Sequence, residues 1–138
     1  MGYEFSIDCL LLEEKMKYIS TDKAPQAIGP YSQGIIAGNT VYLSGQIGID
    51  PAVGKAVEGI EAQTEQICKN IGNLLKEAGT DYAHVVKTTC FLADINDFKT
   101  FNGIYEKYFI SKPARSCVAV KDLPAGMLCE IEVTAVIE

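Results

Sequence analysis

Hydrophobic and polar residues alternate along several stretches of the chain, and this period of two predicts β-strands. Two of these stretches, residues 32–37 and 40–49, are joined by Gly38-Asn39, a pair that suits a hairpin turn. The next stretch, Asp50-Pro51 with Gly54, is expected to be a loop. The expected strands comprise residues 17–19, 32–37, 40–49, 85–93, 115–120 and 128–137.

In two stretches of the chain the spacing of hydrophobic residues changes from the period of a strand to that of a helix. The first helix is expected from about residue 58 to 78, and Gly79 is a good stop for it. Its apolar residues recur at spacings of four, three and four, at Ile67, Ile71, Leu74 and Ala78. The second helix is expected from about residue 97 to 109, with Asn96 as its N-terminal cap. Its stripe consists of Phe98, Phe101, Tyr105 and Tyr108.

The order of the elements is three strands, a helix, a strand, a helix and two strands. This order predicts an α+β fold with one mixed sheet and both helices on a single face. A chain of 138 residues has the length of one domain. We expect this single domain to span residues 16–138. Residues 1–15 carry none of the motifs described below and are expected to be an N-terminal extension or residues added upstream of the domain.

Side chains of the last expected strand divide between two faces of the sheet. The uniformly apolar face should lie under the helices and carries Cys129, Ile131, Val133 and Ala135. Glu130 and Glu132 point the other way. If the last two strands pair as a hairpin, Cys117 lies opposite Glu130 and Arg115 lies opposite Glu132 on the bare face. Such a mixed face is typical of a subunit interface, and the alternative is an Arg115–Glu132 surface pair of little energetic weight.

Composition and charge exclude several classes of protein. The chain is 48% hydrophobic and 22% charged, as in ordinary globular proteins, and its formal net charge is −6. This balance disfavours binding to nucleic acid or to anionic membranes, and no apolar run reaches transmembrane length. The five cysteines form no CxxC pair, which argues against a zinc site and a disulfide framework. We expect no metal or cofactor, and reduced thiols in a cytoplasmic protein.

Several short motifs occur in a specific order from about Met16 to the end of the chain. They are Ile28-Gly29-Pro30-Tyr31-Ser32-Gln33-Gly34, Ser44-Gly45-Gln46, Val86-Lys87-Thr88-Thr89, Asn102 with Tyr105-Glu106, Pro113-Ala114-Arg115-Ser116-Cys117-Val118, and Glu130-Ile131-Glu132. Together they resemble the RidA family of reactive intermediate deaminases, also called the YjgF family. The resemblance implies a chorismate-mutase-like fold and a homotrimer with three clefts between subunits. The implied activity is cofactor-free hydrolysis of 2-imino and 2-enamino acids, of the 2-iminopropanoate and 2-iminobutanoate type, to 2-oxo acids and ammonia.

The resemblance also implies roles for individual residues. Arg115 would bind the substrate carboxylate, because a guanidinium can donate two parallel hydrogen bonds to it. Glu130 would orient the attacking water or take its proton. Backbone groups near Cys117 and near Ser44-Gly45 would fix the substrate. Tyr31 and Asn102 would line the same cleft, with contributions from two subunits.

Alternatives remain open on the sequence alone. Tyr31 could instead be an aromatic residue that packs a turn after Pro30. Cys117 could be a nucleophile, although the single histidine, His84, lies before a distant strand, and we favour a positional role. A non-catalytic ligand-binding or regulatory trimer is a second functional interpretation. An endoribonuclease or translation inhibitor is a third, disfavoured by the acidic charge and the lone histidine. The link formed by residues 110–112 is shorter than expected for the family, which bears on substrate range.

Overall fold

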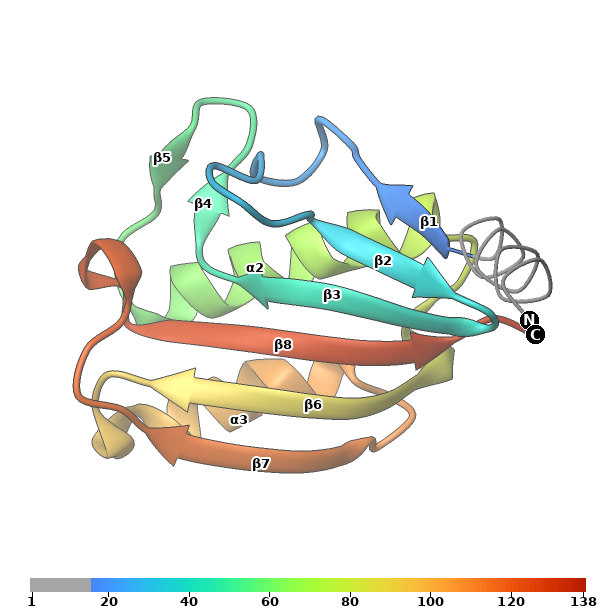
Figure 1. Ribbon diagram of the computed structural model, residues 1–138. Coiled ribbons are helices and arrows are strands. Elements are labelled where there is room, and N and C mark those ends of the chain that lie inside the picture. Colours follow the sequence, from blue (N-terminus) through green and yellow to red (C-terminus); the bar gives the residue numbers. More distant parts are fainter. Residues whose placement is uncertain (1–15) are drawn as a thin grey trace, which may run out of the picture.

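The computed structural model describes residues 16–138, in a sheet with two long helices behind it (Figure 1). The prediction for residues 1–15 lies outside the described residues. The predicted strands and helices are confirmed, with bounds that shift by a few residues, except that the predicted strand 40–49 is interrupted after residue 46. Residues 49–50 instead pair with residues 55–56 in a separate two-stranded sheet that was not predicted. The elements are β1 (Met16–Ile19), β2 (Gly34–Ala37), β3 (Thr40–Gln46), β4 (Ile49–Asp50), β5 (Lys55–Ala56), α2 (Ile60–Glu77), β6 (Val85–Leu92), α3 (Phe98–Tyr108), β7 (Ala114–Ala119) and β8 (Cys129–Val136), with short 3-10 turns at Tyr82–His84, Ile95–Asp97 and Pro124–Gly126.

Helix α2 forms where the apolar spacing predicts it. Its stripe is buried at Ile67, Ile71 and Leu74, and the chain leaves the helix through Gly79, whose φ is 84°. The predicted cap of α3 is wrong. Asn96 lies in the 3-10 turn before α3, where its N–H donates a hydrogen bond to the side chain of Asp94. Helix α3 itself begins without a side-chain cap. Neither helix of the described chain has the length and apolar composition needed to span a membrane.

Six strands form one sheet in the order β1-β2-β3-β8-β6-β7. The β2–β3 hairpin is confirmed, with Ala37 paired to Thr40. Strand β8 lies in the middle and pairs antiparallel with both β3 and β6. Strand β7 is the edge strand and pairs with β6 in parallel, because α3 carries the chain back across the sheet between them.

The predicted hairpin between the last two strands is therefore wrong, since β6 lies between β7 and β8. The parallel register pairs Arg115 with Thr88 and Cys117 with Cys90. Thr88 and Cys90 are fully buried on the face that the helices cover. Arg115 and Cys117 consequently belong to the helix-covered face, and the prediction that they lie on the bare face is also wrong.

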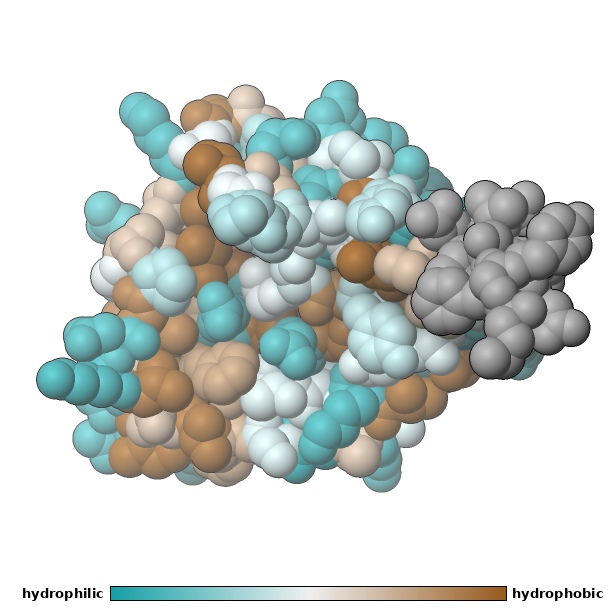
Figure 2. All heavy atoms as spheres, viewed as in Figure 1, coloured by the Kyte–Doolittle hydropathy of each residue, from teal (hydrophilic) through white to brown (hydrophobic). Residues whose placement is uncertain are grey.

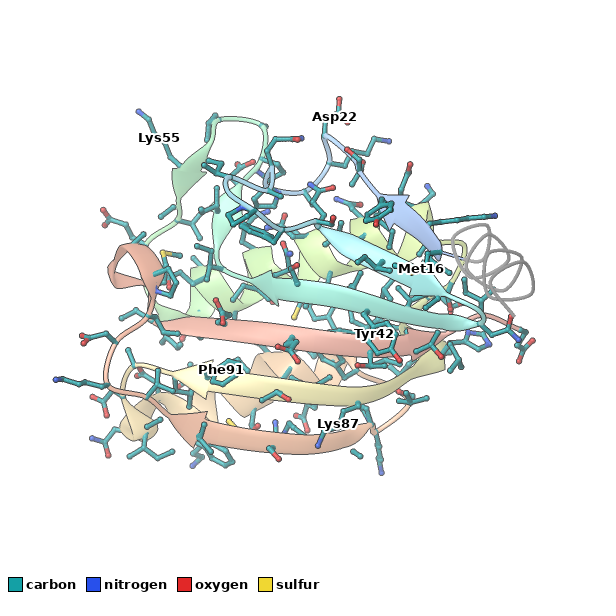
Figure 3. All side chains as sticks on the ribbon, viewed as in Figure 1. Met16, Asp22, Tyr42, Lys55, Lys87 and Phe91 are labelled. Atoms are coloured by element: carbon teal, nitrogen blue, oxygen red, sulfur yellow. The ribbon has the colours of Figure 1, made fainter. Side chains whose placement is uncertain are left out.

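Both helices pack on one face of the sheet, as predicted, and the core lies between them and the sheet (Figure 1). The other face carries no helix. It shows apolar, polar and charged side chains together, and Tyr42, Lys87 and Phe91 stand on it (Figures 2 and 3). Glu130 and Glu132 share this bare face, because they pair with Phe91 and Thr89 of β6. The predicted direction of these two carboxylates is confirmed.

Candidate functional site

Arg115 is the second residue of the edge strand β7, and uncharged groups of α3 hold its guanidinium. Its Nη1 donates a hydrogen bond of 2.7 Å to Oδ1 of Asn102. Its Cζ lies 4.7 Å from the centre of the Tyr105 ring and 5.6 Å from that of Phe98. The only ion pairs within residues 16–138 involve His84, so no carboxylate of that part lies within 4.0 Å of the guanidinium. The positive charge of Arg115 is not neutralised within the described chain.

The backbone of β7 presents an unpaired edge beside this cation. The N–H of Val120 donates to the C=O of Leu92 on β6 over 2.9 Å. Successive residues of a strand direct their N–H and C=O groups to opposite sides, so those of Cys117 and Arg115 point away from β6. A ligand carboxylate at this edge can accept hydrogen bonds from the guanidinium and from the N–H of Cys117 at the same time. We refer to Arg115, Asn102 and the outward backbone of Cys117 as the Arg115 edge.

The thiol of Cys117 is half-buried beside Cys90 on the helix-covered face. Burial raises its pKa above the ordinary value, and the nearby charge of Arg115 offsets only part of this rise. A raised pKa disfavours the thiolate that a nucleophile needs. The local chemistry therefore favours the backbone of Cys117, not its sulfur, as the group available to a ligand.

A cavity of about 680 Å³ adjoins the Arg115 edge. Arg115 and Asn102 line it together with Lys107, Ile110 and Lys112. The short link to β7 is tightly folded, because the N–H of Lys112 donates to the C=O of Phe109 and Lys112 has a φ of 50°. Three cations and the single carboxylate of Glu106 line this cavity, so its net charge favours an anion even though the chain as a whole is acidic.

Glu130 occupies a second and smaller site on the bare face of β8. It is half-buried and shares a cavity of about 240 Å³ with Tyr31 and Gly45. Burial raises the pKa of its carboxyl above the ordinary 4.5, and the negative charge of Glu132 raises it further. A carboxylate with a raised pKa is a stronger base than an ordinary glutamate and is better suited to accept a proton from water. We refer to this cavity as the Glu130 pocket.

The Ser44-Gly45-Gln46 motif makes room for that carboxylate. Leu43 pairs with Val133 and Gln46 with Ile131, so β3 has one more residue than β8 between these pairs, as in a β-bulge. A Cβ added at Gly45 would lie 2.9 Å from both Cδ and Oε2 of Glu130, closer than carbon atoms normally approach. The side chain of Glu130 therefore rests on the bare backbone of the bulge, and a residue with a Cβ at position 45 would displace it.

Tyr31 and Ser44 lie close to the Glu130 pocket. The Tyr31 side chain is 55% exposed and lines both that pocket and a neighbouring hollow that Ser44 and Glu132 share. Its exposure disfavours the alternative of a turn-packing aromatic residue. The hydroxyl of Ser44 donates to the C=O of Ser32, which fastens the bulged strand to the loop that carries Tyr31.

The predicted residues therefore fall into two groups. Tyr31, Ser44, Gly45 and Glu130 gather around the Glu130 pocket, whereas Arg115, Asn102 and Cys117 form the Arg115 edge. Within one chain the groups lie on opposite faces of the sheet, with β6 between their strands. The sequence prediction of a single cluster on the bare face is corrected accordingly.

Sequence reasoning missed the surroundings of Arg115. Phe98 and Tyr105 were predicted only as members of the apolar stripe of the second helix. Tyr105 is indeed buried in the core, but both rings also face the guanidinium. Thr88 had no assigned role. Thr88 and Tyr105 are joined by a hydrogen bond of 2.7 Å between their hydroxyl groups. The available signal was the placement of Phe98, Asn102 and Tyr105 on one helix face, at spacings of four and three.

His84 belongs to neither group. Its Nδ1 lies 2.7 Å from Asp81 and its Nε2 lies 3.1 Å from Glu138, and these carboxylates raise the pKa of its ring. The His84 side chain is partly exposed, and both carboxylates beside it are exposed. In residues 16–138 no group of three or more histidine, cysteine, aspartate or glutamate side chains is arranged to hold a metal ion.

The fold and the two groups define the class of this protein, an α+β domain with a bare sheet face and a positively charged strand edge suited to a carboxylate. Residues 21–137 match the family described as Endoribonuclease L-PSP, and the chain belongs to this family. It is the RidA or YjgF family that the sequence motifs indicate.

Individual relatives agree with this assignment. Human 2-iminobutanoate/2-iminopropanoate deaminase is 52% identical over 122 residues, which cover 87% of this chain and 89% of that protein. A putative regulator, AldR, of Lactococcus lactis is 54% identical and covers 87% of this chain and 97% of its own. A crystal structure of a Rid family protein of Yersinia pestis is 49% identical, with a TM-score of 0.86 over 88% of this chain and 99% of its own.

Proposed function

We propose that this protein is a deaminase that hydrolyses short 2-imino acids, such as 2-iminopropanoate and 2-iminobutanoate, to 2-oxo acids and ammonia. The observation that carries the proposal is the guanidinium of Arg115, held by neutral groups and facing no carboxylate of the described chain. A 2-imino acid carries a carboxylate next to the carbon that reacts, and this carboxylate can bind the guanidinium. The similarity to deaminases from several organisms supports the same reaction.

The reaction adds water across the C=N bond and then expels ammonia. Water attacks carbon 2, its proton is taken up, and the imine nitrogen is protonated to give a carbinolamine. This intermediate loses ammonia and leaves the 2-oxo acid. A 2-enamino acid enters after tautomerising to the imine. In our proposal Arg115 binds the carboxylate and Glu130 accepts the proton of the attacking water.

Arg115 and Glu130 lie on opposite faces of the sheet in one chain, so we propose that the working site combines the Arg115 edge of one copy with the Glu130 pocket of another. A homotrimer with three intersubunit clefts, as the resemblance implies, supplies this arrangement. The bare face supports it, because exposed apolar side chains lie on it without a covering element, such as Tyr42 and Val118, which pairs with Phe91. Tyr31 then forms a wall of the cleft and Ser44-Gly45 its floor.

The proposed site needs no cofactor, because carboxylate binding and proton transfer are enough for hydrolysis of an activated imine. Cys117 contributes its backbone N–H and is not a covalent nucleophile in this scheme. The remaining partners are the substrate and water, and neither nucleic acid nor a membrane is part of the proposal. The free thiols Cys68, Cys90, Cys117 and Cys129 suit a compartment that keeps thiols reduced, such as the cytoplasm.

A direct assay tests the proposal. An amino acid oxidase with catalase generates 2-iminopropanoate or 2-iminobutanoate from alanine or 2-aminobutanoate, and the early rate of ammonia release is followed with and without the protein. We expect acceleration by the native chain and almost none by Arg115→Ala. The matched control is Lys99→Ala, which removes a surface cation from α3 and should keep native rates. An unaccelerated rate with the native trimer would leave a regulatory, ligand-binding protein as the better interpretation.

Two further measurements test the proposed homotrimer and its shared site. Light scattering at micromolar concentration should give the mass of three chains. Mixing Arg115→Ala with Glu130→Gln subunits should then restore part of the activity, because some clefts receive one native residue from each parent. If the mixture of the two variants stays inactive after their subunits have exchanged, the result contradicts a site shared between subunits.

A further inference from the structure

The guanidinium of Arg115 is held in place by contacts within its own chain. The groups around it are neutral: the Asn102 amide, the Tyr105 ring and the Phe98 ring. Faces of aromatic rings attract a cation through their quadrupole without using its N–H donors. A guanidinium has five such donors, and one of them is engaged by Asn102. This arrangement holds the charge while leaving donors for a ligand.

Helix geometry explains how the three contacts arise. Phe98, Asn102 and Tyr105 are separated by four and three residues, so they lie in a row on one side of α3. The Arg115 side chain lies along this row, with the amide acceptor in the middle and an aromatic ring toward each end. The row therefore resists displacement of the guanidinium in either direction along the helix.

The Tyr105 ring is itself fixed from two other directions. It stacks on Phe109 with ring centres 4.1 Å apart and an interplanar angle of 17°. Its hydroxyl lies 2.7 Å from Oγ1 of Thr88, which is fully buried on β6 beside Arg115. The ring that supports the cation is thereby tied to the same strand pair that carries the cation.

A carboxylate in the place of these rings would also hold Arg115, but it would compete with the substrate for the same donors. Charge-assisted bidentate pairs are strong, and a substrate would have to displace one. Neutral support avoids this competition and keeps the planar fork oriented before the ligand arrives.

We infer that Phe98 and Tyr105 are positioning residues that hold the guanidinium of Arg115 in its carboxylate-binding orientation, and that Thr88 acts through Tyr105. This inference rests on the proposed function, in which Arg115 binds the substrate carboxylate. It assigns Tyr105 and Phe98 no contact with the reacting atoms. Their removal should weaken substrate binding and leave the chemical step nearly unchanged.

The test measures binding and turnover separately. NMR titration with pyruvate, a carboxylate of product type, gives the dissociation constant for the native protein and for Phe98→Leu and Tyr105→Leu. We expect each leucine variant to raise Kd, and KM for the imine, by about 3- to 10-fold, with kcat within about twofold. Phe98→Tyr keeps an aromatic face toward the guanidinium and should therefore keep the native Kd. Tyr18→Leu is the matched control, since Tyr18 is 68% exposed at the opposite edge of the sheet.

A double-mutant cycle separates positioning from a general structural effect. In an Arg115→Met background, Phe98→Leu should change neither Kd nor residual kcat/KM further, because no guanidinium remains to be held. An equal loss in both backgrounds, or no loss in the native background, overturns the inference. Phe98 is 36% exposed, so its variant is expected to fold even if Tyr105→Leu does not. Pyruvate binding is independent of turnover, so these outcomes stay distinct from a failure of the proposed deaminase activity.

Discussion

The Arg115 edge and the Glu130 pocket hold opposite charges by different means. Arg115 is surrounded by an amide and two rings, which keep its orientation and leave its charge available. Glu130 rests on a glycine bulge, half-buried and beside a second carboxylate, and both influences raise its pKa. The first environment suits recognition of an anion and the second suits proton transfer. In our proposal, carboxylate binding and proton transfer therefore belong to separate regions of the chain.

Removing the guanidinium should have the largest effect. Arg115→Ala is expected to lower kcat/KM for imine hydrolysis by roughly 30- to 1000-fold, because a charge-assisted contact contributes about 2–4 kcal/mol. Arg115→Lys should also be strongly impaired, since an ammonium lacks the planar fork. Steady-state kinetics measure both. A folded trimer of Arg115→Ala with near-native rates would refute the division between the two regions.

Glu130→Gln tests the second region, the Glu130 pocket. We expect kcat to fall by about 100-fold, the lower end of what a general base contributes. The Kd for pyruvate should stay within a few-fold of native, because the carboxylate-binding groups are unchanged. Glu58→Gln, an exposed carboxylate that precedes α2, is the control. A loss of pyruvate binding equal to that of Arg115→Ala would show that both regions bind the anion.

Gly45→Ala tests the floor of the Glu130 pocket. The new Cβ would meet the Glu130 carboxyl at 2.9 Å, so that side chain must move. We expect kcat to fall by about 10-fold, as misplaced catalytic groups commonly cost one to two orders of magnitude. Gly103→Ala in α3 meets no atom within 4 Å and should leave kcat unchanged.

The pH dependence offers a finer test. Because the pKa of Glu130 is raised, its carboxylate should become protonated, and kcat should decline, at a higher pH than an ordinary glutamate would give. Glu132→Gln removes a like charge, lowers the pKa of Glu130 and should move this decline to lower pH. Part of the rise should remain in this variant, because burial is the larger cause. A pH–rate profile that does not move, or that moves to higher pH, contradicts the assignment.

The smallest effect concerns stability near the Arg115 edge. Lys112 has a φ of 50°, a region that glycine adopts without strain. Lys112→Gly should raise the free energy of unfolding by about 0.5 kcal/mol, after allowing for the greater freedom of glycine in the unfolded chain. Lys107→Gly, within α3, should lower it by about 1 kcal/mol. Chemical denaturation distinguishes these opposite signs.

Local sequence patterns predicted nearly all of the secondary structure, because the periods of two and 3.6 are carried by neighbouring residues. The order of strands depends on distant pairing, and here the prediction of a β7–β8 hairpin was wrong. The pattern of strand, helix and strand from Val85 to Ala119 is typical of a parallel pair with a crossover. Applying that rule places Arg115 beside Thr88 and under α3.

The candidate site was predicted in composition but not in arrangement. Motif resemblance selected Arg115, Asn102 and Glu130, and alternation along β8 gave the direction of Glu130 correctly. Alternation cannot decide which face of an edge strand is covered until its neighbour is known, so Arg115 was assigned to the wrong face. The support from Phe98 was missed because an aromatic residue in a helical stripe is ordinarily explained by the core.

The central position of β8 has a consequence for biosynthesis. The last strand of the chain pairs with both β3 and β6, so the sheet has a gap until residues 129–136 have been made. A nascent chain that stops short of this strand exposes two unpaired strand edges and an open core, which favour association with other chains. Because β8 joins β3 to β6, we expect the sheet of this domain to close only after residues 129–136 have been made.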